Sequence, residues 1–282
     1  MGDLNLIALP NRAVLRVHGE DARSFLQGLI TQDVTTLSAD QALYSLFLNA
    51  QGKFLFDFFL IADDADILLE MDAVRAPEFL KLLSLYKLRA KAAIEDVSAD
   101  YAVHAALDTK PDLPGFVFAD PRHTEMGWRI VTPSGSTLDA TTPPEDYTAR
   151  RIELGIPEGD LDNIPGQTLP LENGLDHLNA ISFHKGCYIG QEVTARTHWR
   201  AKLRKGLYVV EGKSPLPPAH TAILRGEREA GKLLTTQGQH GLALLRMDAV
   251  DSGETLTADG TELHTTLPGW REKAERAASD SQ

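Results

Sequence analysis

The sequence predicts an α+β fold, in which helices cover antiparallel sheet, followed by a small β-rich unit. In the first part of the chain, runs rich in branched and aromatic residues alternate with segments whose apolar residues recur at helical spacing. From residue 205 onward, short strand-like runs such as "KGLYVVEG" alternate with Gly and Pro turns, which is typical of a small β-barrel or sandwich. A chain of 282 residues is also long enough to build more than one core.

The N-terminal elements follow from these periodicities. An alternating, strand-like run over 11–19 precedes an expected helix in 20–34, whose apolar residues repeat at helical spacing. Two or three strands are expected in 41–72, with the first turn at Asn49–Gly52. An amphipathic helix that begins at Pro77 and a further strand complete this part.

The middle of the chain is less regular. Residues 109–144 carry many Pro, Gly and Asp residues and are expected to form strands joined by long turns, whereas 145–158 predicts a helix that ends at Gly155. A domain boundary is expected near Leu203, where the β-rich pattern begins. The expected parts are an α+β region over 1–202, a C-terminal barrel over 203–270, and a tail over 271–282 that is either a frayed helix or disordered.

Composition indicates a folded, water-soluble protein, with 43% hydrophobic and 24% charged residues. No apolar run approaches the roughly 20 residues that span a bilayer, and the start "MGDLNLIALP" lacks the basic region of a targeting signal, so we expect a cytoplasmic location. The formal net charge of −12 disfavours a general nucleic-acid surface. We therefore expect neither nucleic acid nor a membrane as partner.

The only cysteine of the chain, Cys187, lies in "SFHKGCYIGQEVTAR" (182–196). One thiol excludes an internal disulfide and an ordinary four-thiolate cluster. A buried, inert thiol is the structural alternative, but Gly186 and Gly190 leave space around the sulfur. Lys185 and a helix that starts after Gly190 would both favour the thiolate, so we expect a functional thiol.

The motif "KGCYIGQE", together with "RIELGIP" and "LENGLDHLNAISF", resembles the YgfZ family of folate-binding proteins that support iron–sulfur enzymes. That family is related to the aminomethyltransferase T-protein of the glycine cleavage system, and other segments of the chain follow in family order. The resemblance implies two interleaved α+β folate-binding units around a central channel, plus a C-terminal β-barrel. It also implies tetrahydrofolate as cofactor, iron–sulfur client or assembly proteins as partners, and Cys187 at the channel mouth as the catalytic or otherwise reactive group.

The same resemblance suggests folate-binding residues. Glu153 of "RIELG" matches a carboxylate that would accept paired hydrogen bonds from the amino-pyrimidine edge of the pterin. Tyr147 matches a ring-packing aromatic residue, and Arg12 stands where the family has another, although a guanidinium can also stack on a flat ring. The alternative is that Glu153 is an ordinary solvent-exposed residue on a helix surface.

Asp57 is the remaining member of a pair of adjacent carboxylates that T-proteins use on the amine and methylene groups of their substrate. The neighbouring position here is Phe56, and a phenyl ring cannot orient or deprotonate an amine. Aminomethyl transfer by the T-protein route is therefore disfavoured. Asp57 remains a candidate folate contact, or a group that bonds to turn amides.

The rest of the motif is expected to shape the rim of the folate pocket, through Lys185, Tyr188, Gln191, Glu192 and Arg196. An ordinary helix-surface pair between Glu192 and Arg196, worth about 0.2–0.5 kcal/mol, is the alternative for the last two. The basic residues between Arg200 and Lys205 are expected to attract the glutamate tail of folate. His184 and His198 flank the thiol at a spacing that matches no closed zinc site, so no resident metal is expected.

These observations favour a tetrahydrofolate-binding accessory factor in the assembly or repair of iron–sulfur proteins. A folate-dependent aminomethyltransferase or demethylase is the enzymatic alternative. A non-catalytic scaffold, which would bind no folate, is the third. Whether the protein turns over a substrate stays open at this level.

Overall fold

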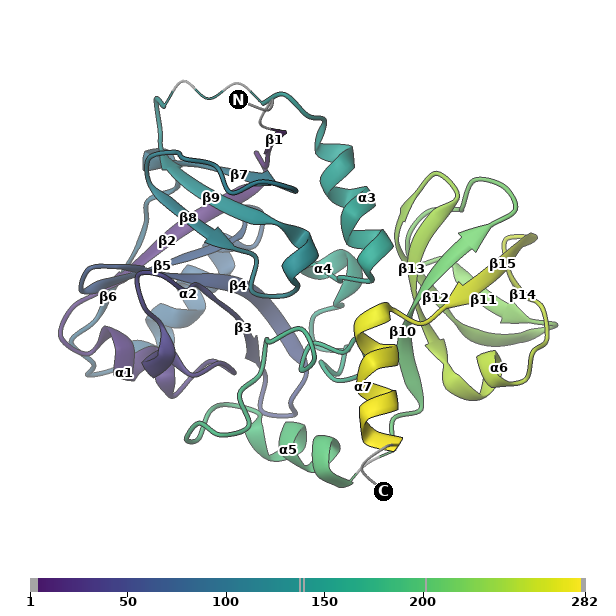
Figure 1. The fold of residues 1–282 in the computed structure, drawn as a ribbon. Coiled ribbons are helices and arrows are strands. Elements are labelled where there is room, and N and C mark those ends of the chain that lie inside the picture. The colour runs from purple at the N-terminus through teal and green to yellow at the C-terminus, as the bar shows by residue number, and fades with distance from the viewer. Residues whose placement is uncertain (1–4, 137, 139, 201, 280–282) are drawn as a thin grey trace. The chain divides into compact units, whose positions relative to one another are not determined.

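The structure is a computed structural model that describes residues 5–136, 138, 140–200 and 202–279 (Figure 1). The chain forms two compact units, each built from several segments. Unit 1 comprises Met1–Gln51, Leu55–Tyr147 and Asn179–Gln191, and unit 2 comprises Gly52–Phe54, Thr148–Leu178 and Glu192–Gln282. The segment Thr148–Leu178 thus belongs with the barrel strands and not with the sheets that precede it in the sequence.

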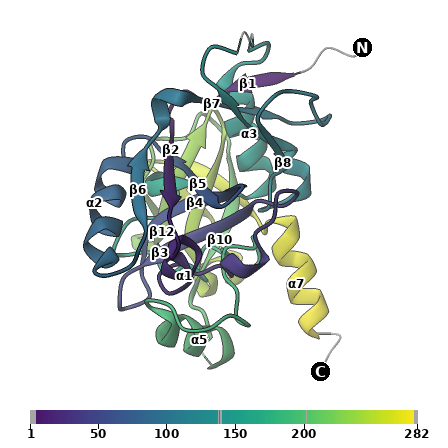
Figure 2. The ribbon, with the colours of Figure 1, turned by 90° about the vertical axis from the view of Figure 1, so that its left-hand side faces the viewer.

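Unit 1 contains a five-stranded sheet in the order β3-β4-β5-β2-β6, in which the β4–β5, β5–β2 and β2–β6 pairs are antiparallel. Its strands are β2 (Arg12–His18), β3 (Leu43–Leu48), β4 (Phe54–Asp63), β5 (Asp66–Asp72) and β6 (Ala93–Asp96). Helices α1 (Ala22–Gln27) and α2 (Ala76–Lys87) bury their apolar residues in the core of this sheet, and α2 lies alongside β6 and β2 (Figure 2). Phe56, Phe58 and Phe79 stack within that core.

A second, four-stranded antiparallel sheet of unit 1 has the order β1-β7-β9-β8. Its strands are β1 (Leu6–Ala8), β7 (Tyr101–Ala106), β8 (Phe116–Ala119) and β9 (Trp128–Pro133). Short 3₁₀ turns occur at η1 (Val34–Thr36), η2 (Ser98–Asp100) and η3 (Thr124–Met126). The predicted antiparallel α+β architecture is confirmed.

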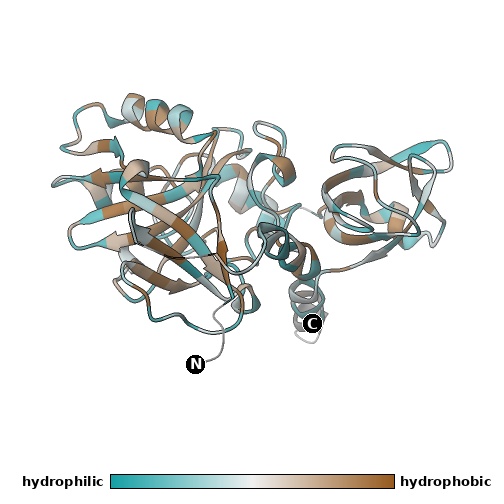
Figure 3. Cartoon of the chain, turned by 90° about the horizontal axis from the view of Figure 1, so that it is seen from above, coloured by the Kyte–Doolittle hydropathy of each residue, from teal (hydrophilic) through white to brown (hydrophobic). Residues whose placement is uncertain are grey.

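Unit 2 contains a closed six-stranded barrel, in the order β10-β13-β12-β11-β14-β15. Its strands are β10 (Lys205–Gly212), β11 (Ala222–Arg225), β12 (Arg228–Gln237), β13 (His240–Arg246), β14 (Leu256–Ala258) and β15 (Thr261–Thr266). Alternate residues of the strands, such as Tyr208 and Val210, fill its interior. Brown, hydrophobic segments occur on strands of both units in Figure 3, and many of these residues are buried.

The remaining helices are α3 (Pro144–Leu154), α4 (Gly159–Asp162), α5 (Gln191–Arg200), α6 (Met247–Asp251) and α7 (Gly269–Ser279). The expected helix end at Gly155 is confirmed, because α3 stops at Leu154 and Gly155 adopts φ +68°. The expected tail is helix α7 as far as Ser279, and residues 280–282 lie outside the described residues. No helix within the described ranges is long and apolar enough to cross a membrane.

Candidate functional site

Cys187 lies in an irregular loop of unit 1 and is a free, exposed cysteine. Gly186 beside it is also exposed, and a side chain built there would meet nothing within 4 Å. Gly190 has φ +82°, a backbone conformation that favours glycine, and α5 begins at the next residue. The expected exposed thiol ahead of a helix is therefore present, and the thiol is not buried.

The base of the Cys187 loop is bonded to the segment that follows α1. The Lys185 ammonium is almost fully buried and donates to the carbonyls of Ile30 and Gln32, both at 2.7 Å. The Ser182 amide donates to the Thr31 carbonyl at 3.0 Å, and the Thr31 hydroxyl donates to the Ala180 carbonyl at 2.6 Å. The thiol thus extends from a loop whose base is fixed only two residues away.

Burial lowers the pKa of Lys185 to about 8, and the nearby Asp33 carboxylate acts in the opposite direction. Its charge is directed at the two carbonyls and lies 5.3 Å from the centre of the buried Tyr188 ring. Lys185 and Tyr188 are therefore brought together beneath the loop. Of the other predicted rim residues, Gln191 is half-buried, whereas Glu192 and Arg196 are exposed on α5.

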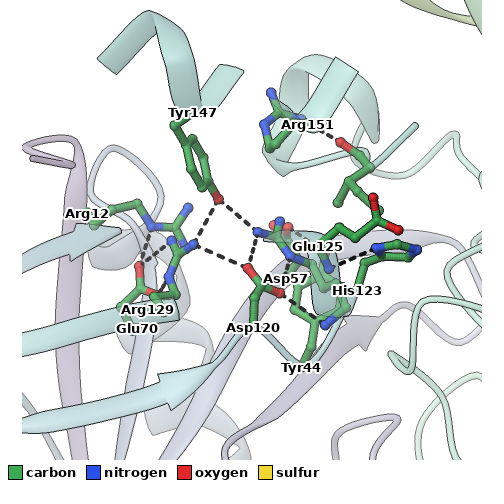
Figure 4. Close-up of polar contacts among 12 residues, drawn as sticks. Arg12, Tyr44, Asp57, Glu70, Asp120, His123, Glu125, Arg129, Tyr147 and Arg151 are labelled. Atoms are coloured by element: carbon green, nitrogen blue, oxygen red, sulfur yellow. Dashed lines mark hydrogen bonds and ion pairs between the residues drawn. The ribbon is translucent and has the colours of Figure 1, made fainter. Parts of the chain in front are cut away.

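A cluster of buried charges crosses unit 1 between its two sheets (Figure 4). Glu70 of β5 is fully buried and accepts hydrogen bonds from Arg12 of β2 and Arg129 of β9. The Arg129 guanidinium also lies 4.2 Å from the centre of the Phe59 ring. Arg12, which was predicted as a ring-packing residue, is thus held by a carboxylate.

Tyr147 joins this cluster through its hydroxyl, which accepts hydrogen bonds from Arg129 and Arg122 at 2.8 Å each. Arg122 is in turn bound by both oxygens of Asp120, at 3.0 and 2.7 Å. The structure therefore brings Tyr147 and Arg12 into one cluster, linked through Glu70 and Arg129. Tyr147 is buried, so its ring is part of a packed polar core.

Asp57 is buried beside this cluster and accepts a hydrogen bond from the Tyr44 hydroxyl at 2.8 Å (Figure 4). Phe56 stands one residue earlier on β4 and packs against Phe79 in the opposite, apolar core. Successive strand residues face opposite sides of a sheet, which explains this division. A carboxylate at position 56 would lie among phenyl rings.

Sequence reasoning missed Glu70, Asp120, Arg122 and Arg129. The available signal was a charged residue in an otherwise apolar strand, as in "DILLEMD" (66–72), because such a charge is either exposed at an edge or paired inside. Together with Asp57, the cluster holds three guanidinium groups and three carboxylates, so its formal charges balance. We infer that this charge cluster holds the two sheets of unit 1 together.

Glu153 lies apart from this cluster in the structure. Its side chain is 72% exposed and is 3.6 Å from Arg150, whereas Tyr147 on the same helix is buried. Within unit 2, Glu153 lines a cavity of about 540 Å³ between the last turns of α3 and the ends of the barrel strands. The lining combines apolar and polar side chains, including Ile152, Val209, Leu267, Gln237, His240 and Thr266.

The cavity has the size and composition of a small-molecule site, since such sites measure roughly 300–1,000 Å³ and are mainly apolar with a few polar groups. Ile152 and Val209 belong to the apolar part of the lining, and Glu153 contributes its acidic group. Among the described residues, no group of His, Cys, Asp and Glu side chains is arranged to hold a metal ion.

Comparison with known proteins identifies relatives over most of the chain. Residues 204–273 match the family described as the CAF17 C-terminal β-barrel domain. The chain is 35% identical to the mitochondrial iron–sulfur cluster assembly factor IBA57 of Homo sapiens, covering 93% of this chain and 84% of that protein. The corresponding protein of Mus musculus is 36% identical with the same coverage, and the homologue of Mycosarcoma maydis is 31% identical, covering 93% and 79%.

Among solved structures, the fold is similar to the glycine cleavage system aminomethyltransferase T of Bartonella henselae. The TM-score is 0.73 at 14% identity, over 93% of this chain and 84% of that one. At this identity the similarity concerns the fold alone. It confirms the expected T-protein-like architecture.

The predicted cytoplasmic location is wrong on this comparison, because the relatives that match most of the chain are named as mitochondrial proteins. The prediction relied on composition and on the first ten residues. The composition of a folded domain reflects water as its solvent, and water fills the cytoplasm and the interior of an organelle alike.

Proposed function

Because the chain belongs to the IBA57 family of iron–sulfur cluster assembly factors, we propose that it assists the assembly or repair of iron–sulfur proteins through the thiol of Cys187. The observation that carries this role is the exposed thiol on a loop with a fixed base. A single thiol can lose its proton to solvent and occupy one ligand position on iron that a partner protein holds. The remaining ligands must then come from a partner protein, which suits an assembly factor better than a cluster enzyme.

The role of Cys187 is tested in a strain that lacks the gene, by measuring the activity of an iron–sulfur enzyme such as aconitase. Wild-type protein should restore the activity and Cys187→Ser should not. A matched control moves the thiol: the variant Cys187→Ser/Ser214→Cys keeps one exposed cysteine but places it on the barrel, where Ser214 is exposed. Full restoration by Cys187→Ser would contradict the proposed role.

The second part of the proposal is a bound reduced folate. It is supported by the resemblance of "KGCYIGQE" and "RIELG" to folate-binding YgfZ proteins, and by the cavity that Glu153 lines. There the carboxylate would accept two hydrogen bonds from the amino-pyrimidine edge of a pterin, and the apolar wall would cover the ring. Arg12, Tyr147 and Asp57 would act indirectly, by holding unit 1 together.

Calorimetry with tetrahydrofolate tests this part. Glu153→Gln should weaken binding by about 1.5–3 kcal/mol, because a charge-assisted pair of hydrogen bonds is lost. Glu145→Gln is the control, since Glu145 is exposed on the same helix but does not line the cavity. An absence of saturable heat with wild-type protein would remove folate from the proposal and leave the role of Cys187 to its own test.

Aminomethyl transfer is not part of the proposal. Phe56 occupies the position of the second T-protein carboxylate and is buried in an aromatic cluster with Phe79. The chain therefore lacks a group there that could deprotonate or orient an amine.

A further inference from the structure

A concentration of positive charge follows Cys187 in the sequence and lies in unit 2. We define it as the basic surface, which comprises Arg196, Arg200, Lys202, Arg204 and Lys205. No Asp or Glu occurs in the sequence between Glu192 and Glu211, although the chain as a whole has 40 acidic and 28 basic residues. The basic surface therefore has a charge opposite to that of the whole protein.

Most of these charges are not neutralised within the protein. Arg196, Arg200, Lys202 and Arg204 form no ion pair with any residue that the structure describes, and all four are exposed. Further along, Lys202 and Arg204 line a broad concavity of about 980 Å³ together with Arg246 and Asp248, which pair with each other at 2.8 Å. An acidic group that approached this surface would meet unpaired cations.

Trp199 is the apolar residue of the same surface, with 69% of its area exposed. Its ring lies 4.6 Å from that of His198 in an edge-to-face arrangement, and the His198 Nδ1 atom is 3.4 Å from the largely buried Asp176 carboxylate. The indole is thus positioned by its neighbours and still exposed. The only buried residue of α5 is Thr194.

We propose that Trp199 and the basic surface form a docking site for a partner protein with an acidic face, which presents iron to Cys187, so that the thiol loses its proton to solvent and its sulfur ligates the iron. Exposed Trp and Arg side chains dominate the binding energy of many protein interfaces. Cys187 is four residues before Gln191, the start of α5, so the chain alone keeps the two within about 14 Å. The inference rests on the proposed function, because it names the kind of partner that meets the thiol.

A protein fits this surface better than a polyphosphate or an anionic lipid. Binding to polyphosphates relies on an extended basic track, but Asp248 and Asp251 interrupt the surface at its far end and the chain carries a net charge of −12. A folded partner can place carboxylates opposite the Arg and Lys side chains and a pocket over the indole. Such complementarity also steers the encounter, which becomes slower at high salt.

The test compares three variants in a strain that lacks the gene, with iron–sulfur enzyme activity as the readout. Arg196→Glu/Arg200→Glu should lower restored activity at least about tenfold, because repulsion replaces attraction to the acidic face. Trp199→Ala should lower it several-fold. The control Lys81→Glu/Arg228→Glu changes the net charge equally at exposed sites on α2 and the barrel, and should restore normal activity.

Second-site suppressors identify the partner's chemistry. Mutations that restore iron–sulfur enzyme activity in the strain carrying Arg196→Glu/Arg200→Glu should lie in another protein, where they should replace Asp or Glu by Lys or Arg. Circular dichroism checks that each variant is folded. If Arg196→Glu/Arg200→Glu is not folded, the milder variant Arg196→Gln/Arg200→Gln is used in its place. The wild-type protein and the Arg196→Glu/Arg200→Glu variant are also titrated with phosphatidylglycerol vesicles and with single-stranded poly(U). If the wild type binds either probe saturably and the variant does not, the assignment to a protein partner is overturned.

The outcomes separate this inference from the proposed function. If the reversal variant restores full activity while Cys187→Ser restores none, the docking site is wrong and the role of the thiol stands. If both restore full activity, the proposed function itself is wrong. If the reversal fails but its suppressors all lie within this chain, the surface serves the protein's own folding and the docking site is again wrong.

Discussion

Lys185 illustrates how a single residue can carry both a structural and an ionisation role. Its amine is buried and donates to two carbonyls, and burial lowers its pKa to about 8 from the ordinary value of 10.5. A neutral amine still has two hydrogens to donate, so both bonds survive deprotonation. The loop that presents Cys187 therefore keeps its base over a wide pH range.

The first prediction concerns stability against pH. Between about pH 8 and 10.5 the unfolded chain holds the Lys185 proton and the folded chain does not, so the contribution of Lys185 to the free energy of unfolding rises with pH. Below this window both states are protonated, and the folded state bears the full cost of desolvation. The free energy of unfolding of wild type and of Lys185→Met is measured by denaturant unfolding at neutral pH and within this pH window. The stability of the wild type relative to the variant should be higher within the window than at neutral pH. Parallel curves would contradict the lowered pKa.

Glu70 is the residue on which the buried charge cluster depends. It is fully buried and bound by Arg12 and Arg129, so Glu70→Gln leaves two guanidinium groups without their counter-charge. We expect a loss of about 3–5 kcal/mol in the free energy of unfolding, measured by urea denaturation.

The matched control for Glu70 is Glu95→Gln in the same sheet. Glu95 is half-exposed and lies 3.3 Å from His18, and a surface pair of this kind contributes about 0–1 kcal/mol. Similar losses for the two variants would show that the cluster adds little to stability.

At the scale of elements, α7 is held to unit 2 by close contact with a turn. Trp270 donates from Nε1 to the Leu154 carbonyl at 3.0 Å, and its ring covers Gly174, where an added Cβ would lie 2.2 Å from the indole. Gly174 also has φ +67°, which favours glycine. The turn therefore excludes any other side chain for two independent reasons.

Gly174→Ala should accordingly loosen α7, which hydrogen exchange of its amides would detect as faster exchange. Gly226→Ala is the control, because Gly226 has a similar φ of +59° but nothing within 4 Å of the added Cβ. Strain at such a φ alone costs roughly 1 kcal/mol, so the difference between the variants measures the contact with Trp270. Equal exchange of α7 in both would show that the indole moves aside freely.

At the scale of the whole molecule, one cysteine limits what the protein can carry by itself. We predict no stoichiometric iron–sulfur cluster on the monomer purified without oxygen, because an ordinary cluster takes four protein ligands. Iron and sulfide analysis combined with light scattering is the measurement. A cluster on a monomer would refute the prediction, whereas one that bridges two chains or is shared with a partner is compatible with it.

The sequence by itself determined the local elements, the antiparallel sheets, a small β-rich unit from Lys205 onward, barrel or sandwich, and the Cys187 motif. Each of these depends on residues close together in the chain: on apolar periodicity, on turn residues or on a short motif. The start of α5 after Gly190 was predictable for the same reason.

Only the tertiary structure decided which distant residues meet. Arg12 and Arg129 lie 58 and 59 residues from Glu70, Lys185 lies 155 residues from its acceptor Ile30, and local patterns carry no information about such pairs. The same holds for the cavity at Glu153, whose walls come from α3 and from barrel strands some 55 to 115 residues later. Buried charges must find partners wherever the fold brings them, so their pairing is a property of the packed chain and not of any segment.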